Sequence, residues 1–249
     1  MKKIAMYSMK GGVGKTAAAV NLSYLAASEG SSTLLCDLDP QGASTFYFRI
    51  RASKNFNTNK FIKGGKHIDK NIKGTDFPNL NLLPSKLSYR NLDLALDAFK
   101  HSKKRLKQIF KELEYEYDYL FIDCPPGISL VSENVFNASD IIIVPLIPTT
   151  LSELAYEKLL KFFKKNDIDP KKIYTFFSMV EIRKTLHQNT INKLTQENGG
   201  NILQTRIPYR SDVEKMGIYR EPVPVSSPHS DSTQAYIELW DEIKNIFSQ

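Results

Sequence analysis

The fold is decided by the stretch KIAMYSMKGGVGKT, which occupies residues 3–16. Residues 4–7 form a short apolar run that suits a buried strand, and residues 17–28, rich in Ala and Leu, predict a helix. A glycine-rich loop between a strand and a helix is the setting of a phosphate-binding loop, because glycines let backbone N–H groups crowd around a polyphosphate. The free N–H groups at the start of the helix strengthen this effect through their dipole. The stretch therefore predicts a nucleotide site.

Two side chains at the end of this loop have the chemistry that a nucleoside triphosphate requires. Lys15 is placed to reach the β- and γ-phosphates, and the Thr16 hydroxyl to hold Mg²⁺. A glycine-rich turn with two incidental lysines is the alternative, and the flanking strand and helix disfavour it. We therefore expect ATP to contact the whole run of Lys10, Gly11, Gly12, Val13, Gly14, Lys15, Thr16 and Ala17.

The loop departs in one place from the general pattern G-x-x-x-x-G-K-[ST], which would have glycine at position 9. Met9 stands there instead, and Lys10 follows as a second lysine within the loop. The sequence thereby resembles the deviant Walker A group, the ParA/MinD family of dimeric ATPases. This resemblance implies that Lys10 crosses a dimer interface to the nucleotide that the partner binds.

Carboxylates follow the next predicted strand, residues 33–36. Asp37 and Asp39 lie at the carboxyl end of that strand, where an open α/β sheet has its ligand crevice. A simple strand-ending turn is the alternative, since Asp-Pro favours turns. The run 39–41 also resembles the family's first switch, which implies that Asp39 is catalytic and helps to position the attacking water, with Asp37 in support.

A second strong motif is YDYLFIDCPPG, residues 117–127. An apolar strand that ends in aspartate places one carboxylate beside the metal, where it can hold a Mg²⁺-bound water. The D-x-P-P-G ending resembles the Walker B and second switch of the same family. Asp123 is therefore the expected magnesium residue, acting through water.

The bulk properties set the fold class. Strand-like runs alternate with helical runs along all 249 residues, so we expect one P-loop ATPase domain over residues 1–249. Its class would be α/β, a doubly wound and mostly parallel sheet with helices on both faces. The net charge of +7 favours polyanions as partners. Two cysteines, Cys36 and Cys124, without a signal peptide or long apolar span, fit a reduced cytoplasmic protein and are expected in the core.

Two regions between the motifs carry further expectations. Residues 49–73 contain eight basic residues and one acid, with phenylalanines interleaved. Either a solvated, partly mobile surface segment or a phosphate-contacting segment explains this run. From about Tyr89 to Glu114, apolar residues recur at helical spacing, which predicts helical packing without visible chemistry.

The C-terminal third resembles ParA/Soj proteins more loosely. Residues 179–186 resemble the segment that follows their sixth strand, which implies sequence-independent DNA binding at Arg183. A second such arginine would fall at position 212, where this chain has Asp212. Nearby basic residues are the expected substitutes, namely Arg206, Arg210, Lys215 and Arg220. The same likeness implies adenine contacts at Met179 and at Pro208, whose loop corresponds to the part that encloses the base.

The last predicted helix, residues 231–247, separates two branches of the family. MinD relatives end in a basic amphipathic helix that lies on membrane, whereas residues 231–249 carry four acids and one lysine. Anionic lipid would be repelled, so a membrane partner is not expected and the helix should pack on the core.

The resemblance to ParA/Soj proteins therefore implies a cytoplasmic, nucleoid-associated ATPase with ATP and Mg²⁺ as cofactors. It would form an ATP-dependent homodimer, bind DNA non-specifically, and be released when a ParB-like or cargo-adaptor protein stimulates slow hydrolysis. Such proteins segregate plasmids or chromosomes, or position cargo. A MinD-like membrane-cycling ATPase and an ATP-dependent metabolic synthetase on the same fold are the alternatives. A nitrogenase-type reductase would need cluster-ligating cysteines, for which Cys36 and Cys124 have the wrong surroundings.

Overall fold

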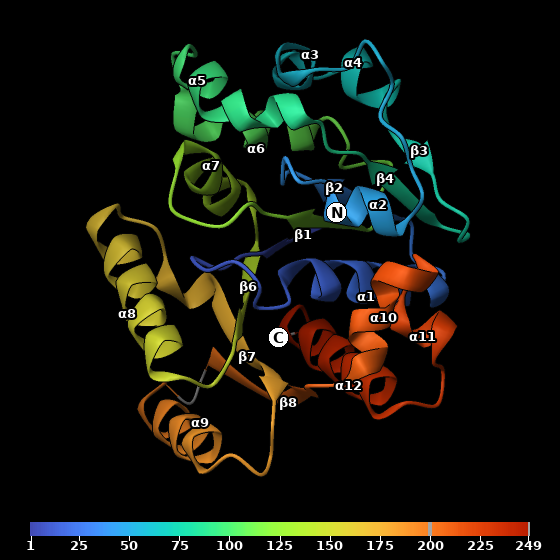
Figure 1. Cartoon of the computed structure of the whole chain (residues 1–249). Helices are drawn as coiled ribbons and strands as arrows, with labels where there is room; N and C mark the ends of the chain where they lie inside the picture. The colour runs from blue at the N-terminus through green and yellow to red at the C-terminus, as the bar shows by residue number, and fades with distance from the viewer. Residues whose placement is uncertain (199–200, 249) are drawn as a thin grey trace.

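One sheet of eight strands forms the centre of the computed structural model, which describes residues 1–198 and 201–248 (Figure 1). The strand order is β3-β4-β2-β5-β1-β6-β7-β8, and only the β3–β4 pair is antiparallel. The predicted α/β class with a mostly parallel sheet is thereby confirmed. The strands are β1 (Lys2–Met6), β2 (Thr33–Asp37), β3 (Lys73–Gly74), β4 (Leu80–Leu83), β5 (Tyr119–Asp123), β6 (Ile141–Leu146), β7 (Ile173–Val180) and β8 (Ile202–Pro208).

Helices cover both faces of this sheet, because alternate residues of its central strands are apolar on both sides. In β5, Leu120 and Ile122 point into one core, and Tyr119 and Phe121 point into the other. The first core is closed by α3 (Thr58–Lys63), α4 (Lys66–Asp69), α5 (Leu92–Asp97), α6 (Arg105–Lys111), α7 (Leu130–Ala138), α8 (Thr150–Lys165) and α9 (Thr185–Asn198). The second is closed by α1 (Lys15–Ser28), α10 (Ser211–Tyr219), α11 (Val223–Ser226) and α12 (Asp231–Ile246), with α2 (Ala43–Tyr47) beside α1.

The last helix packs on the core as predicted. Leu239, Trp240 and Ile243 of α12 are buried, and the Trp240 indole N–H donates to the Glu29 carboxylate at the end of α1 (3.0 Å). Both cysteines are also fully buried, as expected. Among the described residues, no helix combines the length and apolar character needed to cross a membrane.

The helical stretch predicted from about 89 to 114 is divided into short pieces. A 3₁₀ turn, Leu87–Asn91, leads into α5, and a second one, Ser102–Lys104, leads into α6. Phe99, counted among the apolar helical positions, lies between the helices, 39% exposed, with the Arg105 guanidinium over its ring (5.2 Å). The spacing persists across the break because α5 and α6 both face the same core.

The basic segment 49–73 is more firmly packed than a mobile surface segment would be. It contains α3, α4 and the first residue of β3, none of which the composition indicated. Phe56 and Phe61 are buried against Tyr89, with the Phe61 and Tyr89 ring centroids 5.0 Å apart. The phenylalanines therefore fasten the segment to the core and leave the lysines outside.

Candidate functional site: a phosphate-binding loop beside three strand ends

The site lies where the carboxyl ends of β1, β2 and β5 meet. Asp37 and Asp123 are register partners in neighbouring strands, and Met6 of β1 pairs with Asp123 on the other side. The glycine loop, residues 8–14, leaves β1 at this point and enters α1 at Lys15. The parallel register thus brings the loop and both aspartates together, as the sequence predicted.

Backbone conformation explains the glycines of the loop. Gly12 and Gly14 have φ values of 71° and 91°, a region that side chains with a Cβ rarely adopt. A Cβ on Gly14 would also lie 2.8 Å from the Ser178 hydroxyl oxygen on β7. Gly11 and Gly12 are exposed, Val13 is buried, and Thr16 and Ala17 are partly buried on the first turn of α1. At Gly11 and Gly12 the loop therefore exposes its backbone to solvent, while the Val13 side chain is buried.

The Lys15 side chain folds back on this loop and contacts its backbone. Its ammonium donates to the Lys10 carbonyl oxygen (3.0 Å), and the residue is only 7% exposed. Burial lowers the pKa of Lys15, and the nearby carboxylates of Asp123 and Asp39 and the Cys124 thiol act in the opposite direction. A buried ammonium without a fully compensating counter-charge has the chemistry to bind phosphate oxygens. The Lys10 side chain is partly exposed.

Asp123 is the carboxylate best suited to a metal. Burial raises its pKa, opposed by the hydroxyls of Ser44 and Thr16 and by the Lys15 charge. The Ser44 hydroxyl donates to Oδ2 (2.7 Å), whereas Oδ1 is buried without a hydrogen-bond partner among the described residues. A buried oxygen without a donor fits a magnesium-bound water, and the Thr16 hydroxyl lies beside it.

The first switch is held by residues that sequence reasoning did not single out. Asp37 is fully buried, and its Oδ2 accepts hydrogen bonds from the backbone N–H (2.8 Å) and hydroxyl (2.7 Å) of Thr45. The Thr45 hydroxyl oxygen in turn accepts from the Ser85 N–H (2.9 Å), and the Ser85 hydroxyl donates to the Asp39 carbonyl. The hydroxyls of Ser44 and Thr45, which closely follow Asp-Pro-Gln-Gly at a helix start, were a signal in the sequence for this role. Ser85 had no such signal, because it follows β4, far away in the sequence.

Asp39 itself is less enclosed than the other two aspartates. It is partly exposed, and its Oδ1 accepts from the Gln41 N–H (2.9 Å) in the turn that leads to α2. Asp37 is therefore a positioning residue that fixes the start of α2, while Asp39 borders the open side of the site.

The two residues predicted to contact adenine lie on neighbouring strands. Met179 has a φ of 53°, unusual for a residue with a side chain, and its Cε lies near Gly14 of the loop. Pro208 ends β8 and borders a cavity of about 570 Å³. Arg183 and Arg210 line the same cavity, so two residues predicted for DNA share a hollow with one predicted for adenine.

The other basic residues predicted to bind DNA differ in whether their side chains already contact other parts of the protein. Arg206 and Lys215 are exposed. Arg210 is paired with Asp231 (3.1 Å), and Arg220 donates to the Phe46 carbonyl (3.0 Å) and stacks on its ring (4.4 Å). Arg220 therefore bridges α10 and α2.

Asp212 is turned away from the surface that was expected to carry a second arginine. Its Oδ1 accepts from the Ser232 hydroxyl (2.9 Å) at the start of α12. The carboxylate thus joins α10 to α12.

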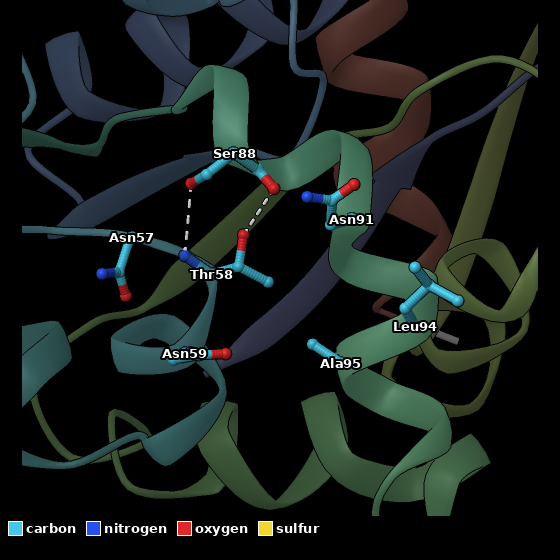
Figure 2. A pocket seen from close by; sticks show the side chains of 7 residues that line it. All are labelled: Asn57, Thr58, Asn59, Ser88, Asn91, Leu94 and Ala95. Carbon is cyan, nitrogen blue, oxygen red and sulfur yellow. Dashed lines mark hydrogen bonds between the residues drawn. The ribbon is translucent and has the colours of Figure 1, made fainter.

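A separate pocket of about 410 Å³ contains none of the predicted site residues. Figure 2 shows that its walls are α3 on one side and the 3₁₀ turn with α5 on the other, where the Thr58 hydroxyl donates to the Ser88 carbonyl (2.6 Å) and the Thr58 N–H to the Ser88 hydroxyl (3.3 Å). Its lining has amide and apolar groups and no charge, namely Asn57, Thr58, Asn59, Ser88, Asn91, Leu94 and Ala95. These bonds fasten two elements, so we assign the pocket a structural role.

A glycine loop after the central strand of this parallel sheet, with buried aspartates at the adjoining strand ends, defines a P-loop nucleotide-binding protein. The AAA domain family matches residues 1–197, so the chain belongs to that family. The resemblance to ParA/Soj-type partition ATPases is confirmed by relatives that match over the full length.

Two comparisons carry this conclusion, and a third shows the fold alone. Sporulation initiation inhibitor protein Soj of Bacillus subtilis is 27% identical over 250 residues, which cover 97% of this chain and 98% of Soj. A putative plasmid partition protein from Borrelia burgdorferi B31 bound to AMPPNP is 26% identical, with a TM-score of 0.84 and 98% of both chains covered. Cobyrinic acid a,c-diamide synthase from Mycobacterium smegmatis, with bound ATP analog and magnesium, has a TM-score of 0.83 at 22% identity, covers 100% of this chain and 96% of its own, and shares the fold.

Proposed function

We propose that this chain is a ParA-like ATPase, one domain over residues 1–249, that forms an ATP-dependent homodimer on DNA. In this proposal it binds DNA non-specifically, moves a plasmid, chromosome or other cargo over the nucleoid in the cytoplasm, and is released by partner-stimulated hydrolysis. The observation that carries the proposal is the deviant loop, in which Lys15 lies below the phosphate position and Lys10 lies on the outside.

ATP would be held by the loop through its phosphates. The backbone N–H groups of residues 11–16 and the Lys15 ammonium are positioned to bind the phosphates, as the AMPPNP-bound relative suggests. Pro208 and Met179 would border the base. Thr16 would ligate Mg²⁺ and Asp123 would hold one of its waters, and the metal would neutralise charge on the phosphates.

Asp39 would position the attacking water for hydrolysis. It lies at the open side of the site, and the Ser85 and Thr45 hydroxyls fix the backbone on which it stands. The described residues include no arginine hydrogen-bonded to the loop or to Asp123, so turnover by the protein alone should be slow. A ParB-like or cargo-adaptor partner would accelerate it.

DNA would be bound by Arg183 with Arg206 and Lys215, since these three are exposed. Arg210 and Arg220, committed to Asp231 and Phe46, would contribute less. Dimerisation would double the number of basic side chains that face one duplex, which makes binding ATP-dependent. Each neutralised phosphate releases condensed counterions, so the affinity should fall steeply with salt.

A gel-shift series with the hydrolysis-deficient Asp39→Ala protein tests this function. With ATP, Arg183→Glu should weaken binding to duplexes of every sequence alike, and the basal ATPase of the protein that retains Asp39 should be unchanged by the same substitution. Lys171→Glu, an exposed lysine elsewhere, is the matched control. Absence of any DNA binding by the ATP-loaded protein at low salt would refute nucleoid tracking.

Less evidence supports the two alternative functions, a metabolic synthetase and a MinD-like membrane-cycling ATPase. A synthetase is similar to this chain at 22% identity, which is a likeness of fold alone. A MinD-like membrane cycle would use α12, whose apolar face is buried in the core. Its exposed residues include three acids and no base.

A further inference from the structure

The net positive charge of the chain comes from two segments. The chain has 34 Lys and Arg against 27 Asp and Glu. Residues 49–73 and 98–111 together contain 14 of these basic residues and one of the acids, so the remainder contains 20 basic and 26 acidic residues. Without these segments the chain would be net negative. The excess charge is therefore local.

The fold brings the two segments together. Arg105 at the start of α6 donates to the carbonyls of Ile62 (2.8 Å) and Lys63 (2.8 Å), and Glu112 accepts from the Gly65 N–H (2.6 Å). The arginine and the acid at this junction are thus used to fasten α6 to α3 and α4. The exposed charged residues around the junction are two acids, Asp69 and Glu112, and seven lysines, namely Lys63, Lys66, Lys70, Lys103, Lys104, Lys107 and Lys111.

Three of these lysines form what we call the α6 lysine row: Lys104, Lys107 and Lys111. Lys104 is the residue just before α6, and Lys107 and Lys111 lie one turn apart on the helix. All three line a hollow of about 280 Å³ together with Gln108 and with Asn137 of α7. Figure 1 shows α6 beside α7 in one helix layer. In the described part of the chain, neighbouring Lys103 is paired with Glu133 (2.7 Å), but no row lysine is in an ion pair.

Unpaired like charges at this spacing repel one another. An anionic ligand that neutralises them relieves this repulsion, which favours its binding. The row spans about 10 Å along the helix, and further lysines extend it towards α3 and α4. A lysine ammonium is a point charge and lacks the bidentate geometry by which an arginine guanidinium binds a single phosphate. Several lysines spaced along a surface therefore suit the repeating phosphates of a nucleic-acid backbone. A membrane surface would need apolar side chains to insert, and the residues that line the hollow are Lys, Gln and Asn, with no apolar side chain among them.

We propose that the α6 lysine row binds the phosphate backbone of duplex DNA as a second contact surface, in every nucleotide state. This inference rests on the proposed function, because it takes DNA as the ligand. The row lies in the helix layer beside α7, and α6 contributes none of the residues at the three strand ends that form the nucleotide site. Its contact with DNA consequently needs neither ATP nor a dimer, unlike contact through Arg183. By itself this contact is weaker than that of the ATP dimer, so hydrolysis still releases the protein from the nucleoid.

The test compares two triple variants with the same charge change and spacing. Lys104→Gln/Lys107→Gln/Lys111→Gln removes the row, and Lys158→Gln/Lys161→Gln/Lys165→Gln removes exposed lysines of α8 at the same intervals. Fluorescence anisotropy with a random-sequence duplex, without nucleotide and across a salt series, gives the affinity. The row variant should bind at least tenfold more weakly at low salt, with a log–log salt slope reduced by about 2–3, and the α8 variant should stay within about twofold.

Four outcomes would overturn the inference, and they separate it from the proposed function. Equal losses in both variants would mean that only net charge matters. Normal binding by the row variant, while ATP-dependent binding still requires Arg183, would refute the row alone. Row-dependent binding to phosphatidylserine vesicles, without binding to DNA, would show that the ligand of the row is anionic lipid and not DNA. Failure of the unsubstituted protein to bind DNA in any nucleotide state would refute both proposals together. Thermal melting of each variant verifies that it is folded.

Discussion

Asp123 shows how much a single residue depends on three strands. Its carboxylate lies between β1 and β2, receives one hydroxyl from α2, and keeps one buried oxygen without a partner among the described residues. Asp37 lies beside it, and burial and the Asp123 charge raise the pKa of Asp37. Two buried carboxylates side by side destabilise the fold when both are ionised.

The stability of the nucleotide-free protein should therefore depend on pH through Asp123. Its folded-state pKa, raised by burial to about 6, lies above its ordinary value of 3.8, so the stabilisation is complete below about pH 4 and is lost as the pH rises through about 6. Asp123→Asn should be more stable than the unsubstituted protein by on the order of 1–3 kcal/mol at pH 8. The difference should vanish near pH 4, as urea unfolding at both pH values would reveal. Asp39→Asn, at a partly exposed site, is the control, and an advantage that is equal at both pH values would exclude Asp123 as the cause.

Lys15 and Asp39 should separate ATP binding from hydrolysis. Lys15→Ala removes a charge-assisted contact to phosphate and should abolish nucleotide binding, whereas Asp39→Ala should keep binding and lose turnover. Binding of a fluorescent ATP analogue and phosphate release measure the two properties. Unchanged turnover in Asp39→Ala would remove Asp39 from the mechanism.

At the scale of elements, the basic segment 49–73 is stabilised by its phenylalanines. Phe61 of α3 is fully buried beside Phe56 and Tyr89, so Phe61→Ala should cost about 3–5 kcal/mol in unfolding free energy. Phe46→Ala, at a residue 48% exposed that stacks on Arg220, should cost about 1 kcal/mol or less. Chemical denaturation of both variants measures the difference, and equal costs would mean that α3 is not part of the core.

Elements with strong local signals could be predicted from sequence, and those that depend on distant contacts could not. The strand predicted at 33–36 matches β2, all of whose residues are buried. The break near Phe99 was not predicted, because the apolar residues of α5 and α6 face the same core and so keep a helical spacing across the break. In the site, the loop, Asp37 and Asp123 followed from motifs, whereas Ser85 enters only through the pairing of β2 with β4.

At the scale of the whole molecule, the proposed dimer is tested through Lys10. Light scattering of Asp39→Ala with ATP should show a dimer, because hydrolysis no longer returns the protein to monomer, and ADP should not. Adding Lys10→Ala should restore the monomer if Lys10 reaches the partner's nucleotide. Lys158→Ala, on the exposed face of α8, should leave the dimer intact. A dimer that persists without the Lys10 side chain would refute the cross-interface contact.

The hydrogen bond between the Lys15 ammonium and the Lys10 carbonyl has a consequence for cooperativity. Lys15 serves its own nucleotide, and Lys10 would serve the partner's, so in the proposed dimer one peptide unit belongs to both sites. Phosphates that draw the Lys15 ammonium away would release the Lys10 backbone at the same moment, and filling one site would then alter the affinity of the other without any longer route through the protein. The two nucleotide sites would thus behave thermodynamically as a single unit.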